Sequence, residues 1–437
     1  MAHFQQTAGD NIDDSDDVQI LEDGSNEDLQ ILDAEPIAAT IRGPSQVGQE
    51  RVAECAQRRR LPDDIFNRGS AQLRYHDGSR IRLALGMTIQ SSKTGDILQI
   101  YGISERHNER RYIRCLPFCS VSSKSLANML DKIPNEVCMI QTLYPGDEPH
   151  ESGLILYDFD VDDLGKVEEA HLIITNEHRD SIPPKSTEGD RTPTLVCRWK
   201  LTQVFRTPRS TKDRKIQRQA FQKLRHSECS PGRGVSDSLF REQRDHECSE
   251  NKWYVSPALD ELVDPKHKYT FFDAFCGSGF ASRGALDAGL LVLGGFDCDS
   301  NAQLNYALNH PKSKLWRMRQ DQFLRLRASR YKGRVDVLHI SFPCQYFSPA
   351  HTVSGRNDTE NSDAILGLSE FLARMKPRLV VIEETSGLAE CEKHRDNIQS
   401  LMHDFTRANY EVESTVLNFA EYGLAQNRRR LIIIAAA

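Results

Sequence analysis

The sequence predicts an α/β fold, with an open Rossmann-like sheet in the C-terminal part of the 437-residue chain and a β-rich domain before it. Three observations lead to this prediction. Apolar runs typical of buried strands recur after residue 268, each run ends in a loop with polar or reactive side chains, and shorter strand-like runs gather between residues 86 and 205. Ligands of open parallel sheets bind beyond the carboxyl ends of the strands, so these loops form the expected site.

The first run, Tyr269 to Phe275, leads into a glycine-containing loop and then into a helix expected from Gly284 to Gly289. Glycines such as Gly277 and Gly279 let the backbone approach a ligand closely. The spacing is only a partial Rossmann fingerprint, and a plain tight turn is the alternative. A second run ends about twenty residues later in Asp297-Cys298-Asp299, where a ribose-binding carboxylate belongs. The loop and the acid together favour a nucleotide-like cofactor.

A third run, Val335 to Ile340, ends just before Cys344. A lone cysteine is usually a small buried hydrophobic residue, and that is the alternative interpretation. The next run carries Glu383 and Glu384 at its end, and strand alternation sends Arg428 and Arg430 to one face of the last run. Taken singly, these are more typical of a helix-capping acidic pair and a solvated basic strand entry. Together they supply a nucleophile, an acid and a cation at neighbouring strand ends.

The order of these motifs resembles that of the cytosine-5 DNA methyltransferases over residues 269–437. The matching motifs are Phe275-x-Gly277-x-Gly279, Pro343-Cys344-Gln345, Glu383 and Gln426-x-Arg428-x-Arg430. Glu383-Glu384-Thr385 stands where the family usually has Glu-Asn-Val. This triplet and Ser348-Pro-Ala-His-Thr352 resemble the fungal RIP-defective branch, which is linked to the sexual cycle. The resemblance implies an S-adenosylmethionine-dependent methyltransferase sheet in residues 268–437.

The resemblance also implies the chemistry of the catalytic residues. Cytosine C5 is a poor nucleophile, so a thiolate, here that of Cys344, must first add to C6 of a base that is flipped out of the DNA duplex. A cysteine with the ordinary pKa of about 8.5 needs nearby positive charge to ionise, and Arg428 and Arg430 are expected to supply part of it. Glu383 matches the carboxylate that holds the N3 edge of the base, and it must carry or share a proton when sulfur attacks.

S-adenosylmethionine is the cofactor that the resemblance implies. Matching cofactor-binding residues lie in four loops: Phe275, Gly277, Gly279, Asp297, Cys298, Asp321 and Pro343. Asp297 corresponds to the acid that binds the ribose hydroxyls, and Asp321 to the one that reads the adenine amino group. The chain departs from the family pattern at two points, because the family commonly has Gly before the second acid and often an aromatic residue at Cys298. No metal site is expected at this centre.

Double-stranded DNA is the implied substrate, with Gln345 and Ser348 as DNA-binding residues. The segment from Tyr346 to Ser362 is rich in Ser, Thr, Asn and Gly, as expected for a mobile loop that closes over DNA. Family members continue beyond the equivalent of Arg430 into a target-recognition region and two further motifs. We therefore expect, in this order, a fragment or truncated product, an inactive protein, or a site completed by another chain.

Two other functions remain open at this point. The leading alternative is a catalytically inactive regulator of sexual development or silencing that binds chromatin or DNA, and methylation of RNA cytosine is a third. The chain has eleven cysteines without a disulfide-framework spacing, no signal peptide and no run long enough to span a membrane. With the resemblance, these features predict a nuclear protein.

The net charge of −7 hides an uneven distribution. Residues 1–41 contain eleven Asp or Glu and no Lys or Arg, which predicts an acidic disordered tail over residues 1–45. Val18 to Glu22 and Leu29 to Asp33 are β-prone patches flanked by acids. They resemble SUMO-interacting motifs, which add a strand to a partner's sheet; chance apolar clusters are the alternative.

Residues 86–205 contain four strand-like runs that predict a small β barrel or sandwich: 96–103, 111–118, 136–142 and 170–175. Their order resembles a bromo-adjacent homology domain, which implies contact with histones. Residues 206–255 are expected to form a basic helix and a linker, because Arg198 to Arg225 carries ten basic residues against one Asp. Nuclear import, phosphate neutralisation and a solvated surface all fit that stretch. His226 with Cys229 and His246 with Cys248 could form zinc half-sites, but their spacings differ and chance is favoured.

Overall fold

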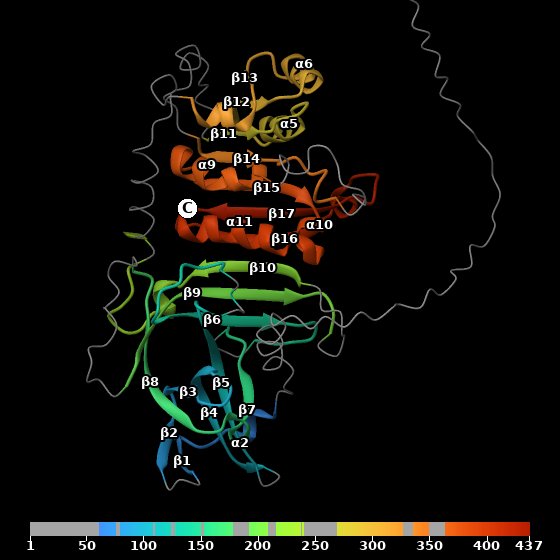
Figure 1. The fold of residues 1–437 in the computed structure, drawn as a ribbon. Helices are drawn as coiled ribbons and strands as arrows, with labels where there is room; N and C mark the ends of the chain where they lie inside the picture. Colours follow the sequence, from blue (N-terminus) through green and yellow to red (C-terminus); the bar gives the residue numbers. More distant parts are fainter. Residues whose placement is uncertain are drawn as a thin grey trace, which may run out of the picture. The chain divides into compact units, whose positions relative to one another are not determined.

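The computed structural model describes residues 61–75, 79–107, 110–123, 126, 128–149, 153–177, 192–208, 216–236, 238–239, 269–326, 335–348 and 363–437 (Figure 1). The acidic tail with both SUMO-like patches, His246, Cys248 and residues 349–362 lie outside these ranges. None of the helices in the described ranges is long and apolar enough to cross a membrane.

The C-terminal part of the chain forms an α/β sheet, as the sequence predicts. Its strand order is β13-β12-β11-β14-β15-β17-β16 (Figure 1). The first five strands in this order are parallel, and β17 is antiparallel to both of its neighbours. The order reverses at β11, which lies between β12 and β14, and such a reversal opens a crevice at the carboxyl ends of the strands. The strand bounds are β11 (Thr270–Ala274), β12 (Leu291–Asp297), β13 (Lys314–Arg317), β14 (Val337–Ile340), β15 (Leu379–Thr385), β16 (Glu411–Asn418) and β17 (Arg429–Ala436).

Helices pack on this sheet because its central strands are apolar on the faces they bury. Ile340 and Ile382 are fully buried and share a core cluster with Phe371 of α9 and Phe405 of α11. The helices of this part are α5 (Phe280–Asp287), α6 (Ser300–Asn309), α7 (Gln320–Leu324), α9 (Leu368–Met375), α10 (Gly387–Glu390) and α11 (Arg395–Arg407), with short 3-10 turns η5 (Ala364–Gly367), η6 (Glu392–His394) and η7 (Phe419–Tyr422).

The helix expected from Gly284 to Gly289 begins earlier, at Phe280. Gly279 adopts a left-handed conformation at the N-cap, and the buried Asp273 carboxylate accepts hydrogen bonds from the Ser282 backbone N–H and hydroxyl. An acid from the preceding strand therefore satisfies the first turn of the helix, and Gly284 lies inside it.

Six strands before this sheet close into a barrel in the order β9-β6-β5-β4-β3-β8, because β8 pairs with β9. The sequence left barrel and sandwich open, and the closed pairing decides for a barrel. Its strands are β3 (Thr88–Ser91), β4 (Ile97–His107), β5 (Arg110–Ser120), β6 (Glu136–Leu143), β8 (Val167–Ile174) and β9 (Thr194–Phe205). β7 (Tyr157–Asp160) pairs with β5, the short α2 (Val161–Leu164) follows it, and β1 (Ser70–Arg74) pairs with β2 (Arg80–Ala84) in a separate small sheet. The likeness to a bromo-adjacent homology domain stays a prediction.

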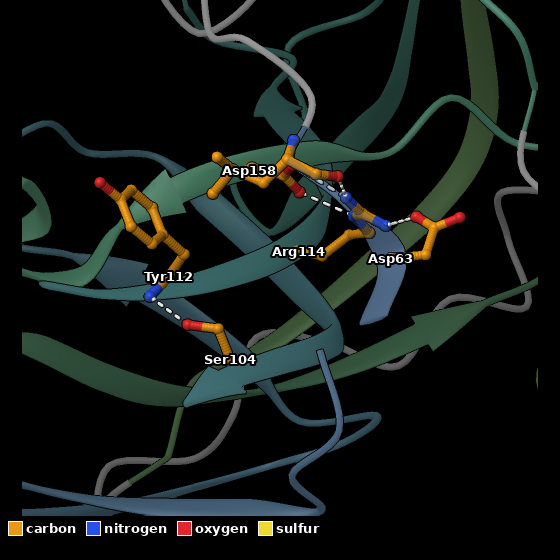
Figure 2. A network of polar contacts seen from close by, with 6 residues as sticks. Asp63, Ser104, Tyr112, Arg114 and Asp158 are labelled. Atoms are coloured by element: carbon orange, nitrogen blue, oxygen red, sulfur yellow. Dashed lines mark hydrogen bonds and ion pairs between the residues drawn. The ribbon is translucent and has the colours of Figure 1, made fainter. Parts of the chain in front are cut away.

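A buried arginine ties the start of the described chain to the barrel (Figure 2). Arg114 of β5 donates two hydrogen bonds to the Asp158 carboxylate of β7, at 2.7 and 2.9 Å, and a further one to Asp63 in η1 (Asp63–Ile65). Its guanidinium also lies 4.1 Å from the ring centre of Phe66. Arg114 and Asp158 are both buried, so water does not compensate their charges. Removing one of them would leave the charge of the other buried without this partner.

The basic helix expected in residues 206–255 is wrong where the structure describes it. Ile216–Lys223 forms strand β10, which pairs antiparallel with β9 on one edge and with β16 on the other. An open edge of β16 would leave a row of backbone groups unpaired, and β10 satisfies it. Arg218 pairs with Glu413 of β16 at 2.6 Å. Residues 230–235, expected in the linker, are held by hydrogen bonds to the end of β8, including two between Val235 and the Asn176 side chain.

The barrel and the α/β sheet also share one hydrophobic core. Val137 and Met139 of β6 pack with other barrel residues, whereas Cys138 and Ile140 of the same strand join the cluster that contains the α/β core. Trp199 and Leu201 of β9 and Phe221 of β10 join that cluster too. Strand alternation thus directs one face of β6 to a cluster within the barrel and the other face to the cluster that the barrel shares with the α/β sheet.

Candidate active site

The predicted site residues come together at one edge of the α/β sheet. Parallel strands end at the same edge, so the loops after β11, β12, β14 and β15 are neighbours there. β17 runs the opposite way and therefore begins at this edge, which brings Arg430 opposite Thr385. The edge carries Gly277 and Gly279 after β11, Asp297 and Cys298 at the end of β12, Pro343 and Cys344 after β14, and Glu383 in β15.

The glycine loop after β11 is held in left-handed backbone conformations. Phe275, Gly277 and Gly279 have φ angles of 58°, 52° and 85°. The Phe275 ring packs between Phe296 and Phe342, with ring centres 5.0 and 5.6 Å away. This packing keeps a non-glycine residue in a conformation that costs energy, which is common where a loop is shaped for a ligand.

Asp297 closes the glycine loop from β12. One carboxylate oxygen accepts a hydrogen bond from the Gly277 backbone N–H, and the other accepts one from the Asp299 backbone N–H, both at 2.9 Å. Each oxygen keeps a second lone pair, so the carboxylate can still accept two hydroxyl groups. An added Cβ at Gly277 would meet no atom within 4 Å, so the loop faces open space. A ribose diol and a nucleoside group therefore fit this arrangement.

The end of α6 clamps the same loop, which the sequence analysis missed. The Asn309 amide donates to the Ser278 carbonyl and His310 Nε2 donates to the Gly279 carbonyl, both at 2.8 Å. The Tyr306 hydroxyl lies 3.2 Å from the Ser282 hydroxyl at the start of α5. No spacing rule links these residues to the loop some thirty positions earlier, so only the fold reveals the contact.

Two predicted cofactor residues lie at the exposed side of the edge. Cys298 is largely exposed. Desolvation of the part of its side chain that is buried has the largest effect on its thiol, and the charge of Asp297 the next largest, and both raise the pKa of the thiol. The Asp321 carboxylate, in α7, lies 3.5 Å from Arg319 and 3.7 Å from Arg325. Asp321 is paired with cations of its own segment.

The predicted catalytic side chains converge on Glu383. Arg430 Nε lies 2.7 Å and Arg428 3.7 Å from one Glu383 oxygen, and the Ser341 hydroxyl donates to the other oxygen at 3.2 Å. Arg429 points elsewhere, to Glu390 at 2.5 Å. Alternation along the strand thus brings Arg428 and Arg430 to one carboxylate, and Ser341 is a further contact that sequence alone did not show.

Cys344 follows β14 in a turn in which its carbonyl accepts a hydrogen bond from the Phe347 backbone N–H. The backbone N–H of Ser348 donates to the Gln345 carbonyl, so both predicted DNA-binding residues lie in this turn. Phe347 is fully buried and packs at 5.0 Å from the His394 ring, and Tyr346 packs at 5.1 Å from that ring. Aromatic packing therefore anchors the turn that presents the thiol.

Of the two arginines expected to favour a Cys344 thiolate, Arg430 does lower the pKa of the thiol, but burial and two acidic side chains outweigh it. Burial, and then the charges of Glu384 and Glu383, raise the pKa of the Cys344 thiol above its ordinary value, and Arg430 opposes them. Arg430 lies 2.7 Å from Glu383, so the negative charge of Glu383 offsets part of the electrostatic effect of Arg430 on the Cys344 sulfur. Burial and the two acids therefore favour the protonated thiol over the thiolate.

Glu384 is the unexpected member of the site. It is fully buried, and this burial raises the pKa of its carboxyl to about 8. From the sequence it was notable only as a Glu in place of the usual Asn.

Comparison with known proteins agrees with this geometry. Residues 269–437 match the C-5 cytosine-specific DNA methylase family. The chain is 30% identical over 184 residues to the type II methyltransferase M.Sau96I of Staphylococcus aureus, covering 40% of this chain and 42% of that protein. Over 188 residues it is 27% identical to the DNA (cytosine-5)-methyltransferase PliMCI of Paracentrotus lividus, covering 40% of this chain and 12% of that protein.

The chain spans about two fifths of the length of the bacterial relatives it matches first. Among solved structures, the Dnmt2 methyltransferase of S. pombe is 17% identical with a TM-score of 0.29, over 38% of this chain and 49% of that one. A magnesium protoporphyrin IX methyltransferase from Synechocystis with bound SAM is 14% identical with a TM-score of 0.26, over 45% of this chain and 79% of that one. The matched family is one of enzymes, and S-adenosylmethionine is its methyl donor.

Proposed function

We propose that the protein is a DNA (cytosine-5) methyltransferase. The observation that carries the proposal is the position of Cys344 after β14, beside the Glu383–Arg430 pair and across the edge from the glycine loop, within a segment that matches this family. Open parallel sheets place reactive groups and cofactor loops at the same edge, which is what a transfer between a cofactor and a base requires.

In this proposal Cys344 releases its thiol proton to solvent and adds as a thiolate to C6 of a flipped cytosine, which makes C5 nucleophilic. Glu383, oriented by Arg430 and Ser341, holds the N3 edge and places a proton where negative charge develops. S-adenosylmethionine supplies the methyl group for C5 when it is bound. Gly277 and Asp297 would hold its nucleoside part through the open loop and the free carboxylate lone pairs. Solvent water then takes the C5 proton, the electron pair of that bond re-forms the C5=C6 double bond, and the Cys344 sulfur leaves C6 as a thiolate.

The proposal is tested by trapping. Duplex DNA that contains 5-fluorocytosine cannot lose a C5 proton, so we expect a denaturation-resistant protein–DNA adduct that requires both S-adenosylmethionine and Cys344. The assay compares the present chain, a longer chain with any downstream coding sequence, and Cys344→Ser in each. Cys298→Ser is not an adequate control because it lies beside the cofactor loop, and Cys391→Ser is used instead. If neither folded form gives an adduct, the non-catalytic chromatin or DNA-binding function becomes the better one.

Several finer proposals accompany this function. Glu383-Glu384-Thr385 supports a place in the fungal RIP-defective branch, and with it a nuclear protein that acts in silencing. The acidic β-prone patches at Val18 to Glu22 and Leu29 to Asp33 support SUMO as a partner, and the barrel supports a contact with histones. An N-terminal peptide that shows no SUMO-dependent NMR shifts would remove the SUMO proposal.

A further inference from the structure

Glu384 lies on the apolar face of β15. Buried and less buried residues alternate along the strand, and Glu384 follows Val380 and Ile382 on the fully buried side. Glu383 lies on the other side, where it meets Arg430. The two adjacent carboxyl groups thus occupy different environments, one with cations and one within the core.

The hydrogen bonds of Glu384 do not compensate an ionised carboxylate. Its Oε2 accepts one bond, from the Thr385 backbone N–H at 2.9 Å. Its Oε1 is buried and has no hydrogen-bond partner within the part of the chain that the structure describes. A charged carboxylate normally accepts several bonds when it is buried, so this environment favours the neutral acid.

Cys344 follows β14, the strand next to the one that carries Glu384. Ile340 pairs with Ile382 and the Ser341 hydroxyl donates to Glu383, so the chain that leaves β14 toward Cys344 starts beside the carboxyl end of β15. The charged groups that act on the Cys344 sulfur are Glu384, Glu383 and Arg430, and of the two acids Glu384 has the larger effect. The charges acting on Glu384 are those of Glu383 and Arg430.

We propose that Glu384 is a positioning residue that carries a proton in the resting site and thereby keeps a second buried negative charge away from Cys344. This inference rests on the proposed function, because it concerns the nucleophile of that reaction. While Glu384 is neutral, a thiolate at Cys344 faces only Glu383, which Arg430 neutralises. Once Glu384 loses its proton, carboxylate and thiolate oppose each other, and two such sites titrate as a coupled pair. The Cys344 thiolate is therefore harder to form at pH values above the one at which Glu384 loses its proton.

The test is the pH dependence of Cys344 alkylation by iodoacetamide in the full chain, without DNA or methyl donor, read by mass spectrometry of the Cys344 peptide. Thiolate formation sets the rate. In Glu384→Gln the opposing charge is gone, and we expect the midpoint to move to lower pH by about one unit, which makes alkylation about tenfold faster below it. Glu390 pairs with Arg429 and carries the same kind of charge, so Glu390→Gln is the matched control and should leave the midpoint unchanged. Exposed Cys298 serves as the internal reference.

An unchanged midpoint in Glu384→Gln, or a shift to higher pH, overturns the proposal. Should that variant fail to fold, difference infrared spectroscopy of the wild-type protein decides. The proposal requires a carboxylic-acid C=O band near neutral pH that disappears on alkaline titration, and absence of that band refutes it. Alkylation needs no methyl transfer, so failure of the trapping experiment and failure of this one are distinguishable.

Discussion

The burial of Glu384 also predicts how the stability of the fold depends on pH. Burial raises the pKa of this carboxyl from 4.5 to about 8 in the folded protein. Between these values the unfolded chain has released the proton and the folded chain still holds it. The folded state therefore binds more protons, and stability falls as pH rises through this window. Below pH 4.5 the contribution is fully retained, and above about pH 8 it is lost.

The magnitude follows from the width of the window. Each pH unit within it changes the free energy of unfolding by about 1.4 kcal/mol. From about pH 5 to about pH 7, Glu384 alone should lower the stability of the wild-type protein by about 2.5 kcal/mol. A side chain that does not titrate has no such slope. The difference in stability between Glu384→Gln and the wild type should therefore move in favour of the variant by that amount.

Urea unfolding at a series of pH values measures this difference, with far-UV circular dichroism and tryptophan fluorescence as two probes of the same transition. Glu384→Leu is the control for the amide, because it is equally unable to titrate and should show the same slope relative to the wild type. A pH-independent difference between wild type and both variants would show that the carboxyl ionises normally in the fold, and the reasoning from its unpartnered oxygen would be wrong.

Two further predictions concern the clamp and the barrel. His310→Ala removes the donor to the Gly279 carbonyl, so we expect calorimetry to show S-adenosylhomocysteine binding weakened by about tenfold. His310→Gln keeps a donor and should recover part of the affinity. Equal affinities in all three proteins would show that the clamp does not affect cofactor binding. Asp158→Asn removes the buried charge that pairs with Arg114, and we expect it to lower the free energy of unfolding by about 3–5 kcal/mol in urea titrations. A loss below about 1 kcal/mol would mean that Asp63 and water replace the partner.

Local features predicted the strands and the order of the motifs well. The run before Cys298 is strand β12, and the run before Cys344 contains β14. β12 is buried on both sides and β14 alternates between buried and partly buried residues, and both patterns are signals that depend on nearby residues only. The stretch that became β10 was harder, because its basic residues are compatible with a helix. Its conformation is set by the edges of β9 and β16, the latter nearly two hundred residues away.

The sequence by itself determined which residues are available for chemistry and that they follow strand ends: Cys344, Glu383, Arg430 and the glycine loop. Only the tertiary structure decided their electrostatics, since burial and the charge of Glu384 outweigh the effect of Arg430 on the thiol, and Arg430 also pairs with Glu383. The clamp from α6, the shared core of barrel and sheet, and the buried carboxyl of Glu384 were likewise decided by packing. The physical reason is range. Strand propensity depends on residues that are adjacent in the sequence, whereas burial and charge pairing depend on groups that only folding brings together.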